Sequence, residues 1–245
     1  MCTVSWLPGP DGYTLCFNRD ELHTRLPATP PAARTADGVE YLAPLDGDSG
    51  GTWLAVNEFG LSLGLLNRYR VPGYVPPAAP VSRGLLILEL ISSRTALWAM
   101  AVLEDRDLAQ VQPFSLVALE PGQPARVAAW DGAAVTALTH RAPGLIISSS
   151  SVTEPEVALA RRTAFASLER ITPAGLAALH ASHIPARGRC SICMHRDDAE
   201  TQSFSTVTVA AETITLVHVP DAPCRGTALP PLTLARRPLP CPAPH

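Results

Sequence analysis

Cys2 directly follows the initiator methionine and is the residue of this sequence best suited to covalent chemistry. Methionine aminopeptidases remove Met when the next residue is small, so we expect the mature chain to begin with this cysteine. A terminal cysteine carries a nucleophilic sulfur and an α-amino group, with reference pKa values of about 8.5 and about 8. The amine can therefore accept the thiol proton as a general base and later return it to a leaving amine.

A polar run, Asn18-Arg19-Asp20-Glu21, is the second feature with chemical potential. It begins at the end of the second of two β-prone segments, residues 2–7 and 13–18, which a Pro-Gly-Pro-Asp-Gly turn joins into a predicted hairpin. The hairpin brings this run back beside Cys2. There a guanidinium would favour the thiolate, and a carboxylate would orient the amine.

The direction of the side chains decides whether both charges can act on Cys2. In a regular strand Arg19 and Asp20 point to opposite faces, so both can serve Cys2 only where the strand has ended or bulged. The alternative is a structural pair, in which the arginine and a carboxylate hold a loop together.

Gly47-Asp48-Ser49-Gly50-Gly51 matches the nucleophile motif of trypsin-like serine proteases. A serine of that kind needs a histidine base and an aspartate, and in that family the histidine lies far upstream. Only His23 precedes Ser49, and its neighbours are not those of the protease histidine. We therefore interpret the motif as a glycine-rich loop that enters a strand over residues 52–56.

Cys190-x-x-Cys193, with His195 close by, has half of the ligand spacing of a zinc site. A second close pair is missing, because Cys224 and Cys241 lie in or near the proline-rich end of the chain. No βαβ unit begins here, as a thioredoxin-like redox pair would require. A structural zinc is the alternative, but we expect buried or idle thiols and predict neither a metal nor a cofactor.

The composition excludes several classes of protein. All 19 basic residues are arginines, which excludes Schiff-base chemistry, a Walker-A loop and a protein-kinase site, although His195-Arg196-Asp197 looks like part of a kinase loop. With a formal charge of −3 and no basic cluster, nucleic acid is not an expected partner. No apolar run approaches the ~20 residues of a membrane span, and no secretion signal is present, so we expect a cytoplasmic protein.

The remaining segments read as strands that bracket two helical blocks, which is typical of a layered α+β domain. We predict one domain over residues 1–219 and a proline-rich tail over 220–245 without a packed element. A Pro-, Thr- and Ala-rich loop is expected up to residue 38, and a surface loop that borders a site over 67–80. Helices are predicted over 83–92, 94–105, 155–170 and 173–181, and further strands over 52–56, 61–66, 114–119, 126–130, 135–138, 145–148, 205–210 and 213–219.

Several of these segments together resemble a known family. Met1-Cys2-Thr3, Asn18-Arg19-Asp20-Glu21, Gly50-Gly51-Thr52-Trp53-Leu54 and Asn67 resemble the NRDE family, which includes the Transport and Golgi organisation 2 (TANGO2) proteins. That family is similar to the N-terminal nucleophile (Ntn) hydrolases, and the resemblance implies their four-layer αββα sandwich. Asn57-Glu58-x-Gly60-Leu61 and Asn67 also resemble the choloylglycine hydrolases and penicillin V acylases of that superfamily.

The resemblance implies a set of site residues. Cys2 would be nucleophile and base, with Arg19 and Asp20 in support, and the backbone N–H of Asn67 would donate to the oxyanion. The acylases take a second donor from an asparagine at the start of a helix, and Ser149 or Ser150 occupies that place here. The predicted substrate contacts are Asn18, Glu21, Trp53 and Arg68.

This chain departs from its relatives at two points. The supporting Arg and Asp are adjacent here, whereas two residues separate them in the acylases. Relatives often carry Thr-Arg-Ser-Ser near the C-terminus, and Thr201-Gln202-Ser203 stands here, so a contact to an anionic substrate is lost.

Two functions are therefore expected for one small-molecule site. The first is hydrolysis of a linear amide by acyl transfer to Cys2, without a cofactor. The second is a catalytically silent protein that binds or transfers a hydrophobic ligand, haem or an acyl-CoA or lipid. A haem iron would have to be held by Cys2, a lone histidine or a tyrosine, because no other haem-ligand signature is present.

Overall fold

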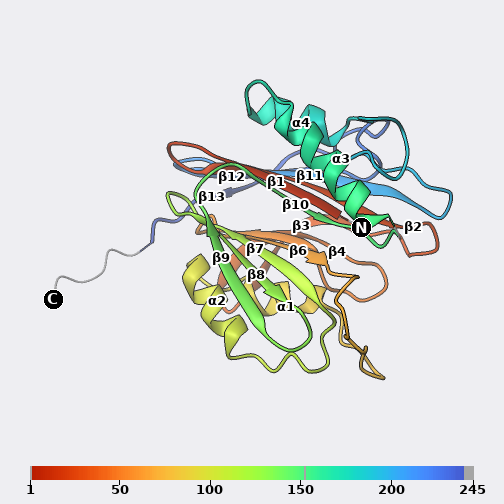
Figure 1. Ribbon diagram of the computed structural model, residues 1–245. Coiled ribbons are helices and arrows are strands. Elements are labelled where there is room, and N and C mark those ends of the chain that lie inside the picture. Colours follow the sequence, from red (N-terminus) through yellow and green to blue (C-terminus); the bar gives the residue numbers. More distant parts are fainter. Residues whose placement is uncertain (1, 152, 240–245) are drawn as a thin grey trace.

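Two antiparallel β-sheets stack face to face, and a pair of helices covers the outer surface of each sheet (Figure 1). These elements are seen in a computed structural model that describes residues 2–151 and 153–239. The layers follow the order helix, sheet, sheet, helix. The predicted αββα sandwich is confirmed.

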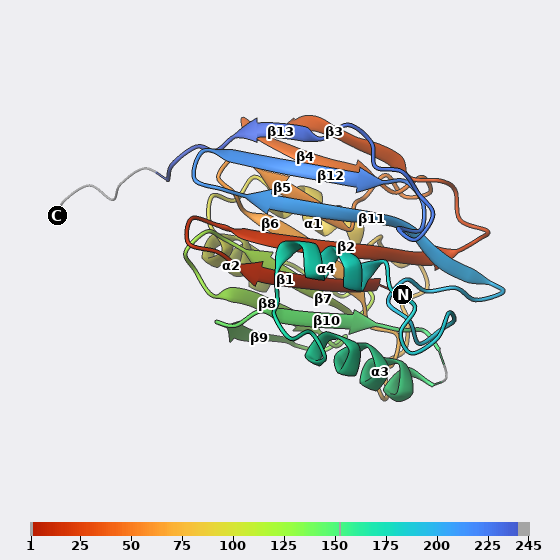
Figure 2. The same ribbon diagram turned by 90° about the horizontal axis from the view of Figure 1, so that it is seen from above.

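The first sheet brings strands from the start, the middle and the end of the chain side by side (Figure 2). Its hairpin at the N-terminus is the one predicted from the sequence, with a third strand paired to the other edge of its first strand. The order across the sheet is β10 (Gly144–Ser148), β1 (Cys2–Pro8), β2 (Tyr13–Leu22), β11 (Ala199–Val209), β12 (Thr213–Val219) and β13 (Leu232–Ala235).

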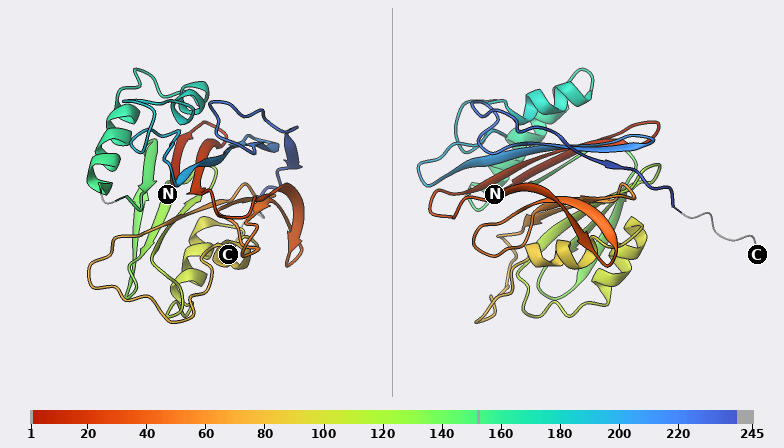
Figure 3. Two further views of the ribbon diagram at one scale, coloured as in Figure 1. Left: turned by 90° about the vertical axis from the view of Figure 1, so that its right-hand side faces the viewer. Right: turned by 180° about the vertical axis from the view of Figure 1, so that it is seen from behind.

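The second sheet follows the chain order, since each of its strands pairs with the next one. Its strands are β3 (Thr29–Ala36), β4 (Val39–Leu45), β5 (Leu54–Asn57), β6 (Ser62–Asn67), β7 (Phe114–Leu119), β8 (Ala125–Trp130) and β9 (Val135–His140). A long segment without helix or strand follows β6, as the sequence predicts, and its yellow-orange trace loops outward in Figure 3.

In the described part of the chain, four helices complete the outer layers (Figure 1). α1 (Gly84–Leu90) and α2 (Ala96–Glu104) cover the second sheet, and α3 (Glu154–Ala166) and α4 (Pro173–His180) cover the first. α4 begins where the Thr172 hydroxyl accepts the N–H of Gly175, which satisfies a free donor of the first turn. No helix of the described residues has the length and apolar character needed to cross a membrane.

The alternation of β1 shows how the sequence separates the layers. Cys2, Val4 and Trp6 pack into the apolar layer between the two sheets. The residues between them face the helices, where Thr3 accepts a hydrogen bond from α3 and Ser5 is hydrogen-bonded to α4. One face of β1 is therefore apolar core and the other carries buried polar contacts.

Two segments expected to lack regular structure form edge strands instead. β3 lies within the predicted loop before residue 38, and β13 lies within the proline-rich tail. Both occupy an outer edge of a sheet, where a proline does not interrupt a ladder on its free side. The expectation that no packed element follows Val219 is therefore wrong for β13, and α3 ends at Ala166, before the predicted residue 170. Cys241 lies outside the described residues.

Candidate active site

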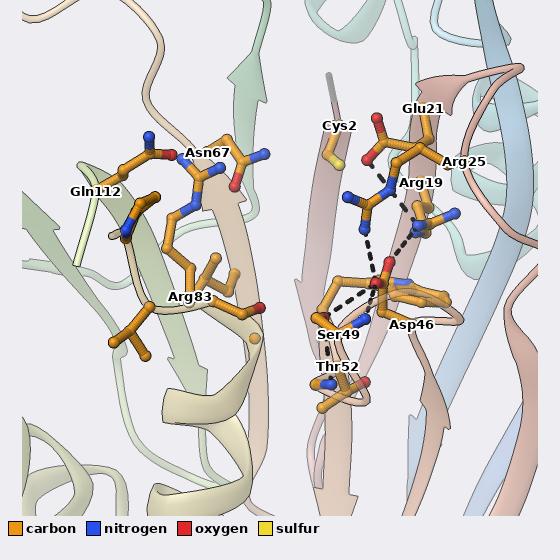
Figure 4. A pocket seen from close by; sticks show the side chains of 17 residues that line it. Cys2, Arg19, Glu21, Arg25, Asp46, Ser49, Thr52, Asn67, Arg83 and Gln112 are labelled. Carbon is orange, nitrogen blue, oxygen red and sulfur yellow. Dashed lines mark hydrogen bonds and ion pairs between the residues drawn. The ribbon is translucent and has the colours of Figure 1, made fainter. Parts of the chain in front are cut away.

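Cys2 is paired on both sides of its strand, with Arg19 of β2 and with Ser148 of β10. Residues paired across an antiparallel ladder project to the same face, so Cys2 and Arg19 both face the space between the sheets. The Cys2 side chain is buried, and it lines a cavity of about 270 Å³ to which both sheets contribute (Figure 4).

Arg19 is fixed beside Cys2 by two contacts. Its Nη2 donates to Oδ2 of Asp46 at 2.6 Å, and its guanidinium lies 4.6 Å from the centre of the Trp53 ring. Glu21, two residues along β2 and on the same face, reaches the same Nη2 at 3.9 Å. The side chain is therefore held by charge and by stacking, and little freedom remains at the cavity wall.

Asp46 organises the loop between β4 and β5. Its Oδ1 accepts hydrogen bonds from the N–H and hydroxyl of Ser49 and from Nη2 of Arg25. Burial opposes ionisation, but these hydrogen bonds and the charge of Arg19 lower the pKa of Asp46 to about 2. The serine of the protease-like motif thus supports a carboxylate, which agrees with its interpretation as a glycine-rich loop.

Two glycines let this loop approach α1 closely. A Cβ on Gly51 would lie 2.7 Å from the backbone carbon of Gly84, and a Cβ on Gly84 would lie 2.8 Å from the backbone nitrogen of Thr52. The N–H of Thr52 donates to the carbonyl of Gly84 at 3.1 Å. Arg83, immediately before α1, is thereby held on the cavity wall opposite Cys2 (Figure 4).

Arg83 is a half-buried cation on that wall. Its Nη1 donates to the carbonyl of Pro113 at 3.2 Å, and within residues 2–151 and 153–239 no carboxylate forms an ion pair with it. Burial lowers the pKa of its guanidinium. The Gln112 side chain lies on the same wall and adds a neutral donor and acceptor (Figure 4).

Asp20 lies on the other face of β2, under the helices. Its Oδ2 forms an ion pair at 3.3 Å with Nη1 of Arg161 on α3, and both side chains are fully buried. Its Oδ1 accepts from the hydroxyl of Thr201 at 2.7 Å, and the same Nη1 of Arg161 donates to Thr3 at 2.6 Å. This second network lies directly behind the strand that carries Cys2.

Asn67 ends β6 on the far wall of the cavity. Its carbonyl accepts the hydroxyl of Ser148, the strand partner of Cys2. The N–H of the next residue, Arg68, donates to Pro113 on the β7 side at 3.0 Å. Because N–H groups alternate along a strand, the N–H of Asn67 points away from β7.

The protonation of Cys2 follows from its surroundings. Burial raises the pKa of its thiol, and the carboxylates of Asp20 and Glu21 act in the same direction. The group is therefore a thiol at neutral pH, and its attack on a carbonyl carbon needs a base.

Of the residues predicted for the site, five line the cavity: Cys2, Arg19, Glu21, Trp53 and Asn67. Asn18 faces the helices, where its side-chain amide donates to the carbonyls of His180 and Ile192 at 2.9 and 3.0 Å. Ser149 is buried outside the cavity, and its hydroxyl accepts the N–H of Ser151 at 3.2 Å. Arg68 contributes a backbone contact beside the cavity rather than a side chain that lines it.

The sequence analysis missed Asp46, Arg83 and Arg161. Asp46 had a local signal, because an aspartate before Gly-Asp-Ser-Gly can accept the loop's own donors. Arg83 is the first residue of a predicted helix, just after the long loop. Arg161 had no such signal, since only the packing of α3 brings it beneath β2.

The fold is that of the N-terminal nucleophile hydrolases. It is similar to a Caenorhabditis elegans N-acylethanolamine-hydrolyzing acid amidase ortholog, with a TM-score of 0.59, 10% identity, and coverage of 84% of this chain and 92% of that one. It is also similar to a C2A mutant of the conjugated bile acid hydrolase of Clostridium perfringens, with a TM-score of 0.54 and 13% identity. That match covers 94% of this chain and 92% of the hydrolase. Penicillin V acylase of Agrobacterium tumefaciens matches with a TM-score of 0.53 and 12% identity, over 90% of this chain and 83% of the acylase.

Sequence similarity defines the family within this fold. Residues 1–164 match the Transport and Golgi organisation 2 family, and the chain belongs to that family. The Transport and Golgi organization protein 2 of Drosophila melanogaster is 30% identical over 142 residues, which cover 52% of this chain. The match spans half (50%) of the length of that relative.

Proposed function

We propose that this protein is an amidohydrolase of the N-terminal nucleophile type, which cleaves a linear amide by transferring the acyl group to Cys2. The observation that carries this proposal is the pairing of Cys2 with Arg19 at a cavity lined by both sheets. The fold supports it, since the solved relatives are named as an amidase, a bile acid hydrolase and an acylase.

The reaction begins with removal of Met1, which frees the α-amino group of Cys2. Because burial raises the pKa of the thiol, this amine must take the proton as the sulfur attacks the substrate carbonyl. The tetrahedral intermediate collapses with cleavage of the C–N bond, and the proton goes to the leaving amine. Water then hydrolyses the thioester, which releases the carboxylic acid and restores the thiol.

The negative oxygen of the intermediate needs a donor near the sulfur. The N–H of Asn67 is suited to this, because the alternation of β6 directs it away from β7 and because the Asn67 carbonyl is tied to the strand partner of Cys2. A donor of this kind is worth about 3–4 kcal/mol of transition-state stabilisation. The role of Ser149 as second donor stays a prediction, since its hydroxyl already accepts the N–H of Ser151.

Arg19 and Asp20 have separate roles in this mechanism. Arg19, held by Asp46 and Trp53, presents a fixed positive charge at the wall beside Cys2. Asp20 acts from behind the strand, where its charge raises the pKa of the Cys2 thiol and would stabilise the ammonium that forms when the amine takes the thiol proton.

The cavity favours a substrate with an anionic group. Arg83 faces Cys2 across the cavity, close enough for its charge to act on the Cys2 sulfur once that sulfur is ionised. Within the described part of the chain no carboxylate pairs with Arg83, so a carboxylate or phosphate on the substrate would supply the counter-charge of its guanidinium. Arg83 would thus replace the anion contact that relatives take from the Thr-Arg-Ser-Ser segment.

The second candidate function is binding without catalysis. It is favoured by the position of Ser149, the residue predicted as second oxyanion donor, which does not line the cavity. The cationic wall at Arg83 would then hold the carboxylates of haem or the phosphates of an acyl-CoA. A Cys2→Ala protein would keep these charge contacts.

The test separates the two functions. N-acyl amino acids with short, medium and long acyl chains would be incubated with the mature protein, and the release of amine would be followed. We expect turnover by the wild type and by a Cys190→Ser control, and none by Cys2→Ala. Turnover by Cys2→Ala would overturn the hydrolase proposal. Absence of turnover with tight binding of haem or acyl-CoA by both chains would favour the binding function.

A further inference from the structure

Four metal-ligating side chains meet in a part of the molecule that the proposed reaction does not use: His183, Cys193, His195 and Cys224. The first three come from the segment between α4 and β11, and Cys224 comes from the segment that follows β12. Figure 2 shows both segments, in light and dark blue, at the same end of the first sheet. One donor atom from each side chain lies within 4.8 Å of the other three.

The distances from His195 to the other three side chains fit a tetrahedral metal centre. Nε2 of His195 lies 3.2 Å from Nε2 of His183, 3.6 Å from Sγ of Cys193 and 3.5 Å from Sγ of Cys224. Zinc bound at 2.0–2.1 Å to nitrogen and 2.3 Å to sulfur, with tetrahedral angles, would separate two nitrogens by about 3.3 Å and nitrogen from sulfur by about 3.6 Å. His195 therefore already has the spacing from the other three side chains that ligands of one ion would have.

The surroundings of His195 also match a metal ligand. Its other ring nitrogen, Nδ1, lies 3.3 Å from Oε2 of Glu200, which can only accept a hydrogen bond, and 3.2 Å from Nη2 of Arg187, which can only donate one. The tautomer that carries its proton on Nδ1 bonds to Glu200 rather than to Arg187. Both carboxylate oxygens of Glu200 accept from Arg225, at 2.7 and 2.8 Å. A fixed carboxylate that accepts Nδ1–H leaves the Nε2 lone pair free for a metal, which is the usual arrangement behind a zinc-bound histidine.

We propose that His183, Cys193, His195 and Cys224 bind one Zn²⁺ in a tetrahedral site with two sulfur and two nitrogen ligands. Each cysteine gives up its thiol proton to solvent when the ion binds, so the two thiolates balance the charge of the metal. Because all four positions are filled by protein, the site is structural and leaves no place for a substrate. Cys190 is not a ligand, since its sulfur contacts Glu156 at 3.9 Å.

The ion would join two parts of the chain that lie far apart in sequence. Cys193 precedes Met194, whose N–H donates to the hydroxyl of Thr201, and that hydroxyl donates to Asp20. The site therefore anchors the segment that holds the carboxylate behind Cys2. All four ligands lie beyond residue 164, outside the segment that matches the family, so this site is a feature of the remaining part of this chain.

No metal was predicted from the sequence, because it contains only one close pair of cysteines. Cys190 and Cys193 have the familiar spacing, but only Cys193 joins the cluster. His183 and Cys224 approach it through the packing of α4 and the return of the chain after β12. The sequence did contain a signal, because two histidines and two cysteines lie together in the short segment 183–195. The fourth ligand, Cys224, comes from a different segment.

The experiment measures zinc in the purified full chain after dialysis against metal-free buffer. We expect one zinc per chain in the wild type and in a Cys190→Ser control, and loss of zinc in Cys224→Ser and His183→Gln. Replacement of zinc by Co²⁺ should give the intense thiolate charge-transfer absorption of a site with two sulfurs. Far-UV circular dichroism of each variant shows whether it is still folded, so that loss of zinc can be distinguished from unfolding.

Three results would overturn the proposal. The first is a folded wild type without zinc that gives no cobalt–thiolate absorption. The second is equal loss of metal from the Cys190→Ser control, which would point to a different ligand set. The third is an intact mass lower by two hydrogens without reduction, with the bond mapped to Cys193 and Cys224, which would make this pair a disulfide.

Discussion

Arg19 and Asp20 are neighbours in β2, yet their side chains lie on opposite faces of the first sheet. Arg19 enters the cavity beside Cys2 and binds Asp46, whereas Asp20 lies beneath the helices and binds Arg161. β2 continues through both residues without a break, and the bulge at this level belongs to the neighbouring strand, β11. The charged residues around Cys2 therefore form two separate networks, one on each side of the sheet.

The network behind the sheet should contribute strongly to stability. In Asp20→Asn the buried guanidinium of Arg161 loses its counter-charge, and we expect a loss of about 3–5 kcal/mol in the free energy of unfolding. Urea unfolding followed by circular dichroism measures this loss. A double variant, Asp20→Asn with Arg161→Met, should recover part of it, because no uncompensated charge remains buried. A single variant as stable as the wild type would contradict this role of the pair.

Arg83 should affect substrate affinity more than the chemical step. In Arg83→Gln we expect the KM for a carboxylate-bearing substrate to rise about tenfold or more, with kcat little changed, because one charge-assisted hydrogen bond is lost. Arg70→Gln is a matched control, since Arg70 does not line the cavity and pairs with Glu154 at 3.4 Å. A substrate amide without the carboxylate should show no difference between wild type and Arg83→Gln. An equal rise in KM for both substrates would contradict the proposed contact.

His180 should make the protein less stable in acid. Burial, together with the charge of Arg161, lowers its pKa from the ordinary 6.5 to about 3, and its neutral ring is hydrogen-bonded to Ser5 and Asn18. The unfolded chain binds a proton below pH 6.5 and the folded chain does not until about pH 3, so stability falls as the pH is lowered through that window. The slope for this histidine is up to about 1.4 kcal/mol per pH unit.

A variant isolates that contribution. His180→Gln should be less stable than the wild type at pH 7.5, and the difference should shrink as the pH is lowered, because only the wild type gains the unfolded-state proton at this position. Urea unfolding of both chains at several pH values measures the difference. The histidines and cysteines proposed to bind zinc are present in both chains, so their titration cancels in the comparison. A difference that is constant with pH would show that His180 is not held neutral.

Most of the elements near the site could be predicted from the sequence, and the reason is local. The hairpin of β1 and β2 has a strong turn, and the hydrophobic pattern of β5, β6 and β7 is continuous. β3 and β13 could not be predicted in this way, because half-exposed edge strands that contain or adjoin prolines lack an apolar pattern. Their pairing depends on a sheet that forms elsewhere in the chain.

The site was predictable in part for the same reason. Cys2 and Arg19 lie in one hairpin, so the register of two adjacent strands was enough to bring them together. Asp46, Arg83 and Arg161 reach the networks from a loop, a helix start and a helix face that are remote in sequence. Only the stacking of the two sheets and the packing of α3 bring these charges to Cys2 and Asp20.

The central claim, that Cys2 is an activated N-terminal nucleophile, is tested most directly by intact mass. The purified protein is weighed before and after brief treatment with iodoacetamide, and the adducts are mapped, with Cys190 as a half-exposed internal reference. We predict a mass that lacks Met1 and a label that reaches Cys2 faster than Cys190. A chain that keeps Met1, or a Cys2 that reacts no faster than Cys190, would contradict the proposed mechanism.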